Sequence, residues 1–190
     1  MWRHFGVALC LCCADASVAA QPIDGGRSNA EIGVHLRWLT TVHCAVRRFE
    51  GEVQPVADSE QRVSIRFDVR SLDFAGNEAF ANHARSAEFF DVERYPWAVF
   101  ESAPFAPALL RDGGELRGEL FLRGTFRPVV FQVRPAPCGR PGIDCAIEVS
   151  GKVSRSAFGM TARRFMVKDK VNINFSVLLA QRIAAESAAK

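Results

Sequence analysis

Apolar and polar residues alternate along most of the chain, and this alternation limits the possible folds more than any other feature. Because successive side chains of a β-strand point to opposite faces, a repeat of two predicts strands with one dry face and one wet face. The repeat is regular in five segments: residues 30–36, 62–70, 129–133, 147–153 and 171–177. Less regular strands are predicted at 97–102, at 116–123 and within 39–54.

These segments predict an all-β fold of about eight antiparallel strands. The sequence has no strand–helix–strand alternation, which excludes a parallel sheet. One short helical segment is expected around residues 77–88, where alanines and Phe80 recur with a helical spacing. Strands of this kind can stack as a sandwich, which fills its own interior, or close into a barrel, which can hold a small ligand. The alternation alone does not choose between the two.

The first 20 residues have the order of a secretory signal peptide. Arg3 gives a positive start, a short apolar run follows, and Val18 and Ala20 place small residues where signal peptidase needs them. The run is too short to span a bilayer. We therefore expect cleavage after Ala20, one domain over residues 21–180 and a flexible polar tail over 181–190. The alternative for the first segment is a buried N-terminal helix.

Three cysteines follow the predicted leader. Cys138 and Cys145 enclose a stretch rich in proline and glycine, which favours a return of the chain, and an exported protein lies where disulfides persist. We predict that they form a disulfide, since a metal site would need more ligands and no histidine is near. Cys44 is left over and is interpreted as a small buried side chain.

The sequence shows no pattern that is typical of catalysis. It has no HExxH zinc motif, no GxSxG nucleophile turn, no GxGxxG after a strand and no phosphate-binding loop. His35 and His43 are too isolated for a metal site, and His83 is interpreted as solvated. The basic residues of segment 163–170 are interpreted as a solvated hairpin edge, with an anion site as the alternative. We expect no enzyme activity, no metal and no nucleic-acid partner.

Several motifs, in the correct order, resemble the YceI-like family. They are Ser71-Leu72-Asp73-Phe74, Glu88-Phe89-Phe90-Asp91-Val92-Glu93-Arg94-Tyr95-Pro96, Phe100-Glu101-Ser102, Gly118 to Val129, Arg155-Ser156-Ala157-Phe158-Gly159-Met160 and Lys170 to Ile173. The resemblance runs from about Pro22 to Leu179. It implies an extended, lipocalin-like antiparallel barrel, export to the periplasm, and an interior that holds a polyisoprenoid chain. The chain departs from the family pattern at Ala157 and at Cys44, which stands where the family has glycine.

The dry faces of the strands then become the expected wall of a ligand tunnel. The residues expected to line it are Ile65, Phe67, Val69, Phe131, Val133, Ile173 and Phe175. Phe89 and Phe90 are expected to form part of the wall or a lid, or else to plug the base of the barrel. Arg123 and Arg155 are candidates for contact with a polar head group, with a surface position as the alternative.

The resemblance favours a periplasmic carrier of a long-chain isoprenoid or another amphiphilic lipid, without catalysis. Two alternatives stay open: a quinone-binding accessory to a membrane redox or stress-response system, and a filled barrel that acts as an interaction module. No cofactor is expected besides a bound isoprenoid lipid or quinone. The protein is expected to be a monomer or a homodimer.

Overall fold

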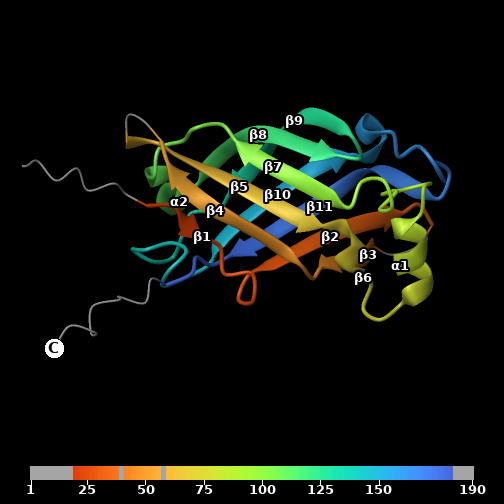
Figure 1. The fold of residues 1–190 in the computed structure, drawn as a ribbon, viewed down its shortest axis with the longest axis horizontal. Coiled ribbons are helices and arrows are strands. Elements are labelled where there is room, and N and C mark those ends of the chain that lie inside the picture. Colours follow the sequence, from red (N-terminus) through yellow and green to blue (C-terminus); the bar gives the residue numbers. More distant parts are fainter. Residues whose placement is uncertain (1–18, 39–40, 57–58, 182–190) are drawn as a thin grey trace, which may run out of the picture.

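A computed structural model describes residues 19–38, 41–56 and 59–181, and in these residues the chain forms one curled antiparallel sheet with two α-helices (Figure 1). The strands are β1 (Gln21–Pro22), β2 (Asn29–Leu36), β3 (Thr41–Val46), β4 (Phe49–Pro55), β5 (Gln61–Asp68), β6 (Leu72–Asp73), β7 (Trp97–Ser102), β8 (Gly114–Leu122), β9 (Thr125–Val133), β10 (Ile147–Ser154) and β11 (Val167–Val177). The helices are α1 (Glu78–Arg85) and α2 (Ala108–Asp112), with 3-10 turns η2 (Val69–Ser71) and η3 (Arg155–Phe158). Most of the predicted leader and the tail from residue 182 lie outside the described residues.

The order of the strands explains why the sheet curls. It is β1-β4-β5-β7-β8-β9-β10-β11-β2-β3-β6, so β3 and β4, which follow each other in the chain, lie near opposite edges. At one end the chain after β1 bridges β4 and the end of β11, because the Ile23 amide donates to the carbonyl of Gly51 and the Asp24 amide donates to the carbonyl of Leu178. The prediction of an all-β, antiparallel, lipocalin-like fold is confirmed, because the strands form one curled antiparallel sheet.

The number of strands differs from the predicted eight for a physical reason. Segment 39–54 contains two strands, because the chain turns a corner at Arg47 and Arg48 and changes neighbours from β2 to β5. The pieces β1 and β6 have two residues each, which is too short for a repeat of two to be visible. The short helix α2 was not predicted.

Helix α1 packs across one end of the sheet (Figure 1). The Asn77 side chain caps it by accepting a hydrogen bond from the Phe80 amide at 3.2 Å. Ala81 and Ala84 are the buried residues of the helix, which is therefore held by a narrow apolar stripe. The helix ends at Arg85, three residues before the predicted end.

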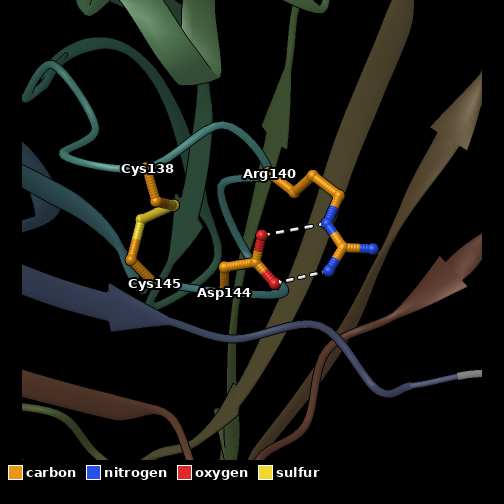
Figure 2. Close-up of a disulfide and its surroundings, with 4 residues drawn as sticks. All are labelled: Cys138, Arg140, Asp144 and Cys145. Carbon is orange, nitrogen blue, oxygen red and sulfur yellow. Dashed lines mark hydrogen bonds and ion pairs between the residues drawn. A yellow bond between two sulfur atoms is a disulfide. The ribbon is translucent and has the colours of Figure 1, made fainter.

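The opposite end of the barrel carries the predicted disulfide. Cys138 and Cys145 are joined with their Cα atoms 6.2 Å apart, and inside this loop the Arg140 guanidinium forms an ion pair with Asp144 at 2.7 Å (Figure 2). The loop is tied to the sheet because the Leu179 amide donates to the carbonyl of Gly142. The disulfide thus fixes the end of the barrel that lies away from α1.

Candidate functional site

The interior of the barrel at the α1 end is a cavity of about 200 Å³. Its lining is almost entirely apolar and comes from α1 and from most strands of the curled sheet, β1, β4 and β6 excepted. The residues contributed by β2, β3, β10 and β11 are Ala30, Ile32, Val34, Leu36, Val42, Cys44, Val46, Val153, Val167, Val171, Ile173 and Phe175. An apolar cavity of about 150 Å³ in another protein stays dry and binds benzene. The space here is therefore suited to a hydrocarbon rather than to water.

A second, smaller cavity of about 40 Å³ lies toward the α2 end. Its wall includes Ile23, Phe105 and Leu110, as well as Ile147 and Val177 beside the disulfide loop. Both cavities are bounded by the same aromatic side chains in the middle of the barrel. Among the described residues, these two cavities are thus chambers separated by a partition, whereas the sequence led us to expect a tunnel.

The partition is a cluster of phenylalanine rings. Phe100, Phe131 and Phe175 line both chambers, and Phe67 lines the larger one. The ring centroids of Phe131 lie 5.1 Å from Phe100 and 5.7 Å from Phe175, and Phe175 stacks on Phe67 at 5.3 Å. These distances are those of favourable aromatic pairs, so the rings hold one another in place across the barrel.

Glycines on neighbouring strands make room for these rings. A Cβ atom at Gly151 would lie 2.4 Å from the ring of Phe131, and one at Gly118 would lie 2.6 Å from the ring of Phe100. Each ring thus occupies space that a side chain at the glycine of the neighbouring strand would fill. The partition is built into the sheet at two positions, one on β8 and one on β10.

The predicted tunnel residues are divided between the chambers. Phe67, Val69, Phe89, Phe90, Phe131, Ile173 and Phe175 line the larger one, whereas Ile65 and Val133 line only the smaller one. Phe89 and Phe90 lie in the wall of the larger cavity, at the α1 end. The sequence did not single out Leu120, Leu122 or the α1 residues Phe80, His83 and Ala84 as lining residues. The dry face of β8 was a signal for Leu120 and Leu122.

Few polar groups reach the larger cavity. His83 lies in the cavity wall with its ring 5.0 Å from that of Phe89, and its side chain is still 42% exposed, in keeping with the solvated position expected. The Cys44 side chain is buried, as predicted, and burial raises the pKa of its thiol to about 12. The thiol therefore stays protonated, and a protonated thiol is a poor nucleophile.

Arg155 is the charged residue in the cavity wall, and it is buried rather than at the surface. Its guanidinium donates to four backbone carbonyls, which are those of Met160 and Ala162 at 2.7 Å, Val167 at 3.2 Å and Lys168 at 3.3 Å. Burial lowers the pKa of the guanidinium, but arginine stays charged in proteins. Four of its five N–H groups hold the chain between η3 and β11, which leaves one for a ligand.

Arg123, the other head-group candidate, lies outside both cavities. Its guanidinium donates to the carbonyls of Gly159 at 2.6 Å and Ala87 at 2.7 Å. These bonds connect the turn after β8 to the segment after α1 and to the end of η3. In this structure Arg123 therefore supports the cavity wall from outside.

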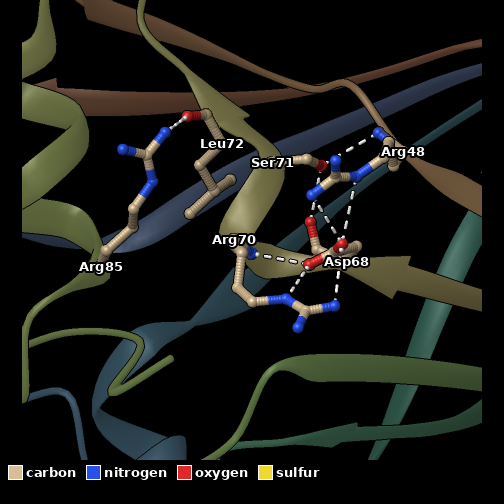
Figure 3. A network of polar contacts seen from close by, with 6 residues as sticks. All are labelled: Arg48, Asp68, Arg70, Ser71, Leu72 and Arg85. Carbon is tan, nitrogen blue, oxygen red and sulfur yellow. Dashed lines mark hydrogen bonds and ion pairs between the residues drawn. The ribbon is translucent and has the colours of Figure 1, made fainter. Parts of the chain in front are cut away.

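A polar network fixes the corner of the wall where β5 ends. The buried Asp68 carboxylate accepts hydrogen bonds from the side chains of Arg48, at 3.1 Å, and Arg70, at 2.8 Å (Figure 3). The bond from Arg70 is the main cause of a lowered pKa at Asp68. Nearby, the Arg85 guanidinium donates to the carbonyl of Leu72 at 2.7 Å and anchors α1. Because Asp68 lies between Phe67 and Val69, the network holds two lining residues in place.

In the ranges that the structure describes, no group of histidine, cysteine and acidic residues is arranged to hold a metal ion. Within the same ranges, none of the helices has the length and hydropathy needed to cross a bilayer.

Comparisons with known proteins agree with this architecture. The family model of the YceI-like domain matches residues 22–179. The UPF0312 protein of Enterobacter sp. (strain 638) is 28% identical over 190 residues, which are 92% of this chain and 95% of that protein. Protein YceI of Salmonella arizonae is 27% identical over 186 residues, covering 91% of this chain and 93% of that protein.

Solved structures show the same fold at low sequence identity. BcnA of Burkholderia cenocepacia superposes with a TM-score of 0.69 at 23% identity, over 84% of this chain and 99% of that one. A polyisoprenoid binding domain from Saccharophagus degradans, implicated in plant cell wall breakdown, gives 0.63 at 13% identity, over 84% of this chain and 96% of that one.

Proposed function

The chain belongs to the YceI-like domain family, and from this premise we propose that it is a periplasmic carrier that holds one long apolar chain of an isoprenoid or similar amphiphilic lipid, without catalysis. The observation that carries the proposal is the larger cavity, which is apolar on nearly its whole surface. Burial of a hydrocarbon contributes about 0.8 kcal/mol per CH₂ group, so such a cavity needs few polar contacts to bind a lipid.

Three further observations support this proposal. A solved relative in fold is described as a polyisoprenoid binding domain. The Cys138–Cys145 disulfide suits an oxidising compartment, in keeping with the predicted signal peptide and with a periplasmic location. The polar groups His83 and Arg155 lie in the wall at the α1 end, where a lipid head group would meet them.

The proposal is tested by changing one lining residue in two different ways. Ile173 on β11 lines the larger cavity and is half-buried, so replacements there act on the cavity more than on a tightly packed core. Ile173→Asp places a charge in a dry space, which costs several kcal/mol unless the carboxyl is protonated. Ile173→Trp keeps the wall apolar but fills the space. Both variants are expected to lose most of the lipid that copurifies with the wild-type protein.

The measurement is mass spectrometry of an organic extract of each purified protein, with lipid expressed per chain. Ser150→Asp is the matched control, because Ser150 is exposed on the neighbouring strand β10 and should leave the lipid content unchanged. Circular dichroism confirms that each variant is folded. Wild-type lipid content in both folded Ile173 variants would falsify the assignment of this cavity as the carrier site.

A further inference from the structure

Large apolar side chains are exposed mainly at one end of this barrel. Of the six that are exposed among the described residues, Val130 lies along β9. The other five lie at the α1 end: Trp38, Phe80, Phe126, Phe165 and Met166. Trp38 and Phe165 are 86% and 89% exposed, which is more than any of the others. Such a concentration on one end marks a surface that interacts with something apolar.

Trp38, Phe165 and Met166 are held next to the cavity by strand pairing. Leu36 and Val167 are paired residues of β2 and β11, and both line the larger cavity. One residue further out, the Arg37 amide donates to the carbonyl of Met166 at 2.8 Å. Trp38 and Phe165 are the next residues outward on these two segments, beside Arg37 and Met166. The apolar lining of the cavity therefore continues outward, past the end of the sheet, onto the exposed tips of two connections.

The same two connections carry positive charge. The segment from Arg155 to Lys168 contains no acidic residue, and neither does the segment from Ile32 to Phe49. In the part of the chain that the structure describes, Arg37, Arg164 and Lys168 have no carboxylate within ion-pair distance, and Arg163 pairs with Glu88 at 3.4 Å. The neighbouring acid of α1, Glu78, is paired with Arg85. We define the rim as Trp38, Phe165 and Met166 with Arg37, Arg163, Arg164 and Lys168.

We propose that the rim docks on the surface of an anionic phospholipid bilayer, so that the cavity takes up or delivers its lipid directly from the membrane. Tryptophan and phenylalanine favour the boundary between head groups and acyl chains, and basic side chains beside them are attracted to anionic lipids. The rim combines both around the end of an apolar cavity. This inference rests on the proposed function for its purpose, but the docking itself does not require a loaded cavity.

The first experiment is vesicle sedimentation with the chain from Gln21 to Lys190, the form expected after export. Vesicles of equal amounts of phosphatidylglycerol and phosphatidylcholine should bind the protein at low salt. Pure phosphatidylcholine vesicles should bind it at least about tenfold more weakly, and raised salt should weaken the binding to anionic vesicles. The Trp38→Ser/Phe165→Ser and Arg164→Gln/Lys168→Gln variants should each lose at least about tenfold in affinity.

The control variant is Arg62→Gln/Arg134→Gln, which removes the same charge as the second rim variant. Both residues are exposed, and they lie at the α2 end, since Gln61 pairs with Phe105 and Ala136 is bonded to Arg111. This variant should bind anionic vesicles like the wild type. Equal losses in the control and the rim variants would show attraction by net charge alone and would overturn the proposal.

A second readout uses Trp38 itself as a reporter. In a Trp97→Phe background, the fluorescence of Trp38 should shift to the blue and be quenched when the vesicles contain brominated lipids. No shift, or a shift that depends on protein concentration without vesicles, contradicts the proposal. The second result would indicate that the rim meets another copy of the chain.

The two proposals fail in different ways. Farnesol supplied from detergent micelles tests the cavity without a membrane, and the rim variants should bind it with wild-type affinity. A protein that binds farnesol but no anionic vesicle overturns the docking and leaves the carrier function intact. A protein that binds the vesicles through the rim but takes up no apolar chain overturns the carrier function and leaves the docking intact.

Discussion

Phe131 is the residue on which the two chambers of the barrel meet. Its side chain is 2% exposed, it contacts the rings of Phe100 and Phe175, and it lies over Gly151. A lipid chain in the larger cavity would run toward this ring and stop there. Under the proposed function, this ring, together with those of Phe100 and Phe175, would limit the length of hydrocarbon that the larger cavity encloses.

Phe131→Ala should therefore join the chambers and admit longer chains. The free energy of unfolding should fall by about 3–5 kcal/mol, because a large buried ring is removed. Extracted lipids should shift to longer chains by mass spectrometry, and Phe131→Leu should give a smaller shift with a smaller loss of stability. Val130→Ala, on the outer face of the same strand, is the control. An unchanged chain length in a folded Phe131→Ala protein would contradict a partition at this residue.

At the scale of elements, the connection between β10 and β11 shows how polar contacts hold the wall. Arg155 ties this connection down through backbone carbonyls, and Asp169 fixes its two ends to each other. The Asp169 carboxylate accepts hydrogen bonds from the Ser154 hydroxyl and from the Ser156 amide. The bond from Ser154, followed by those from Ser156, lowers the pKa of Asp169 from 3.8 to about 2.

This lowered pKa predicts a defined dependence of stability on pH. A carboxyl whose pKa is lower in the folded state binds fewer protons there, so its stabilising effect is present above pH 3.8 and is lost as the pH falls toward 2. Asp169→Asn should be less stable than the wild type at pH 7, and the two should converge as the pH falls through this range. Chemical denaturation at several pH values measures the difference in free energy of unfolding between the two proteins. Asp68 and the other acids are present in both proteins, so their contributions cancel in this difference. A constant difference from pH 7 to pH 2 would contradict the role given to Asp169.

These elements also show where sequence reasoning stops. The repeat of two placed Phe67, Phe131 and Phe175 inside correctly, because strand geometry alone decides which face a residue takes. The repeat could not show that Ile65 and Val133 line the smaller chamber while the other predicted residues line the larger one. The boundary between the chambers depends on rings from four different strands. The burial of Arg155 had no signal in the sequence either, because its partners are backbone carbonyls, which every residue carries.

For the whole molecule, the two ends of the barrel have different characters. The α2 end is closed by the disulfide loop, and it contains the smaller cavity. The α1 end holds the larger cavity, the buried charge of Arg155, and the rim of exposed aromatic and basic side chains. A carrier with one closed end and one membrane-facing end would load and release its lipid at the same place.

The central claim is that an apolar chain lies in the larger cavity, and isotope-filtered NMR on the purified complex tests it most directly. With methyl-labelled protein and its unlabelled copurified lipid, nuclear Overhauser effects are predicted between the lipid chain and the methyl groups of Leu122, Val153 and Ile173. Val130 on the outer surface should show none. Contacts of the lipid with Val130 but with none of the three cavity residues, or a folded protein that carries no lipid, would contradict the account.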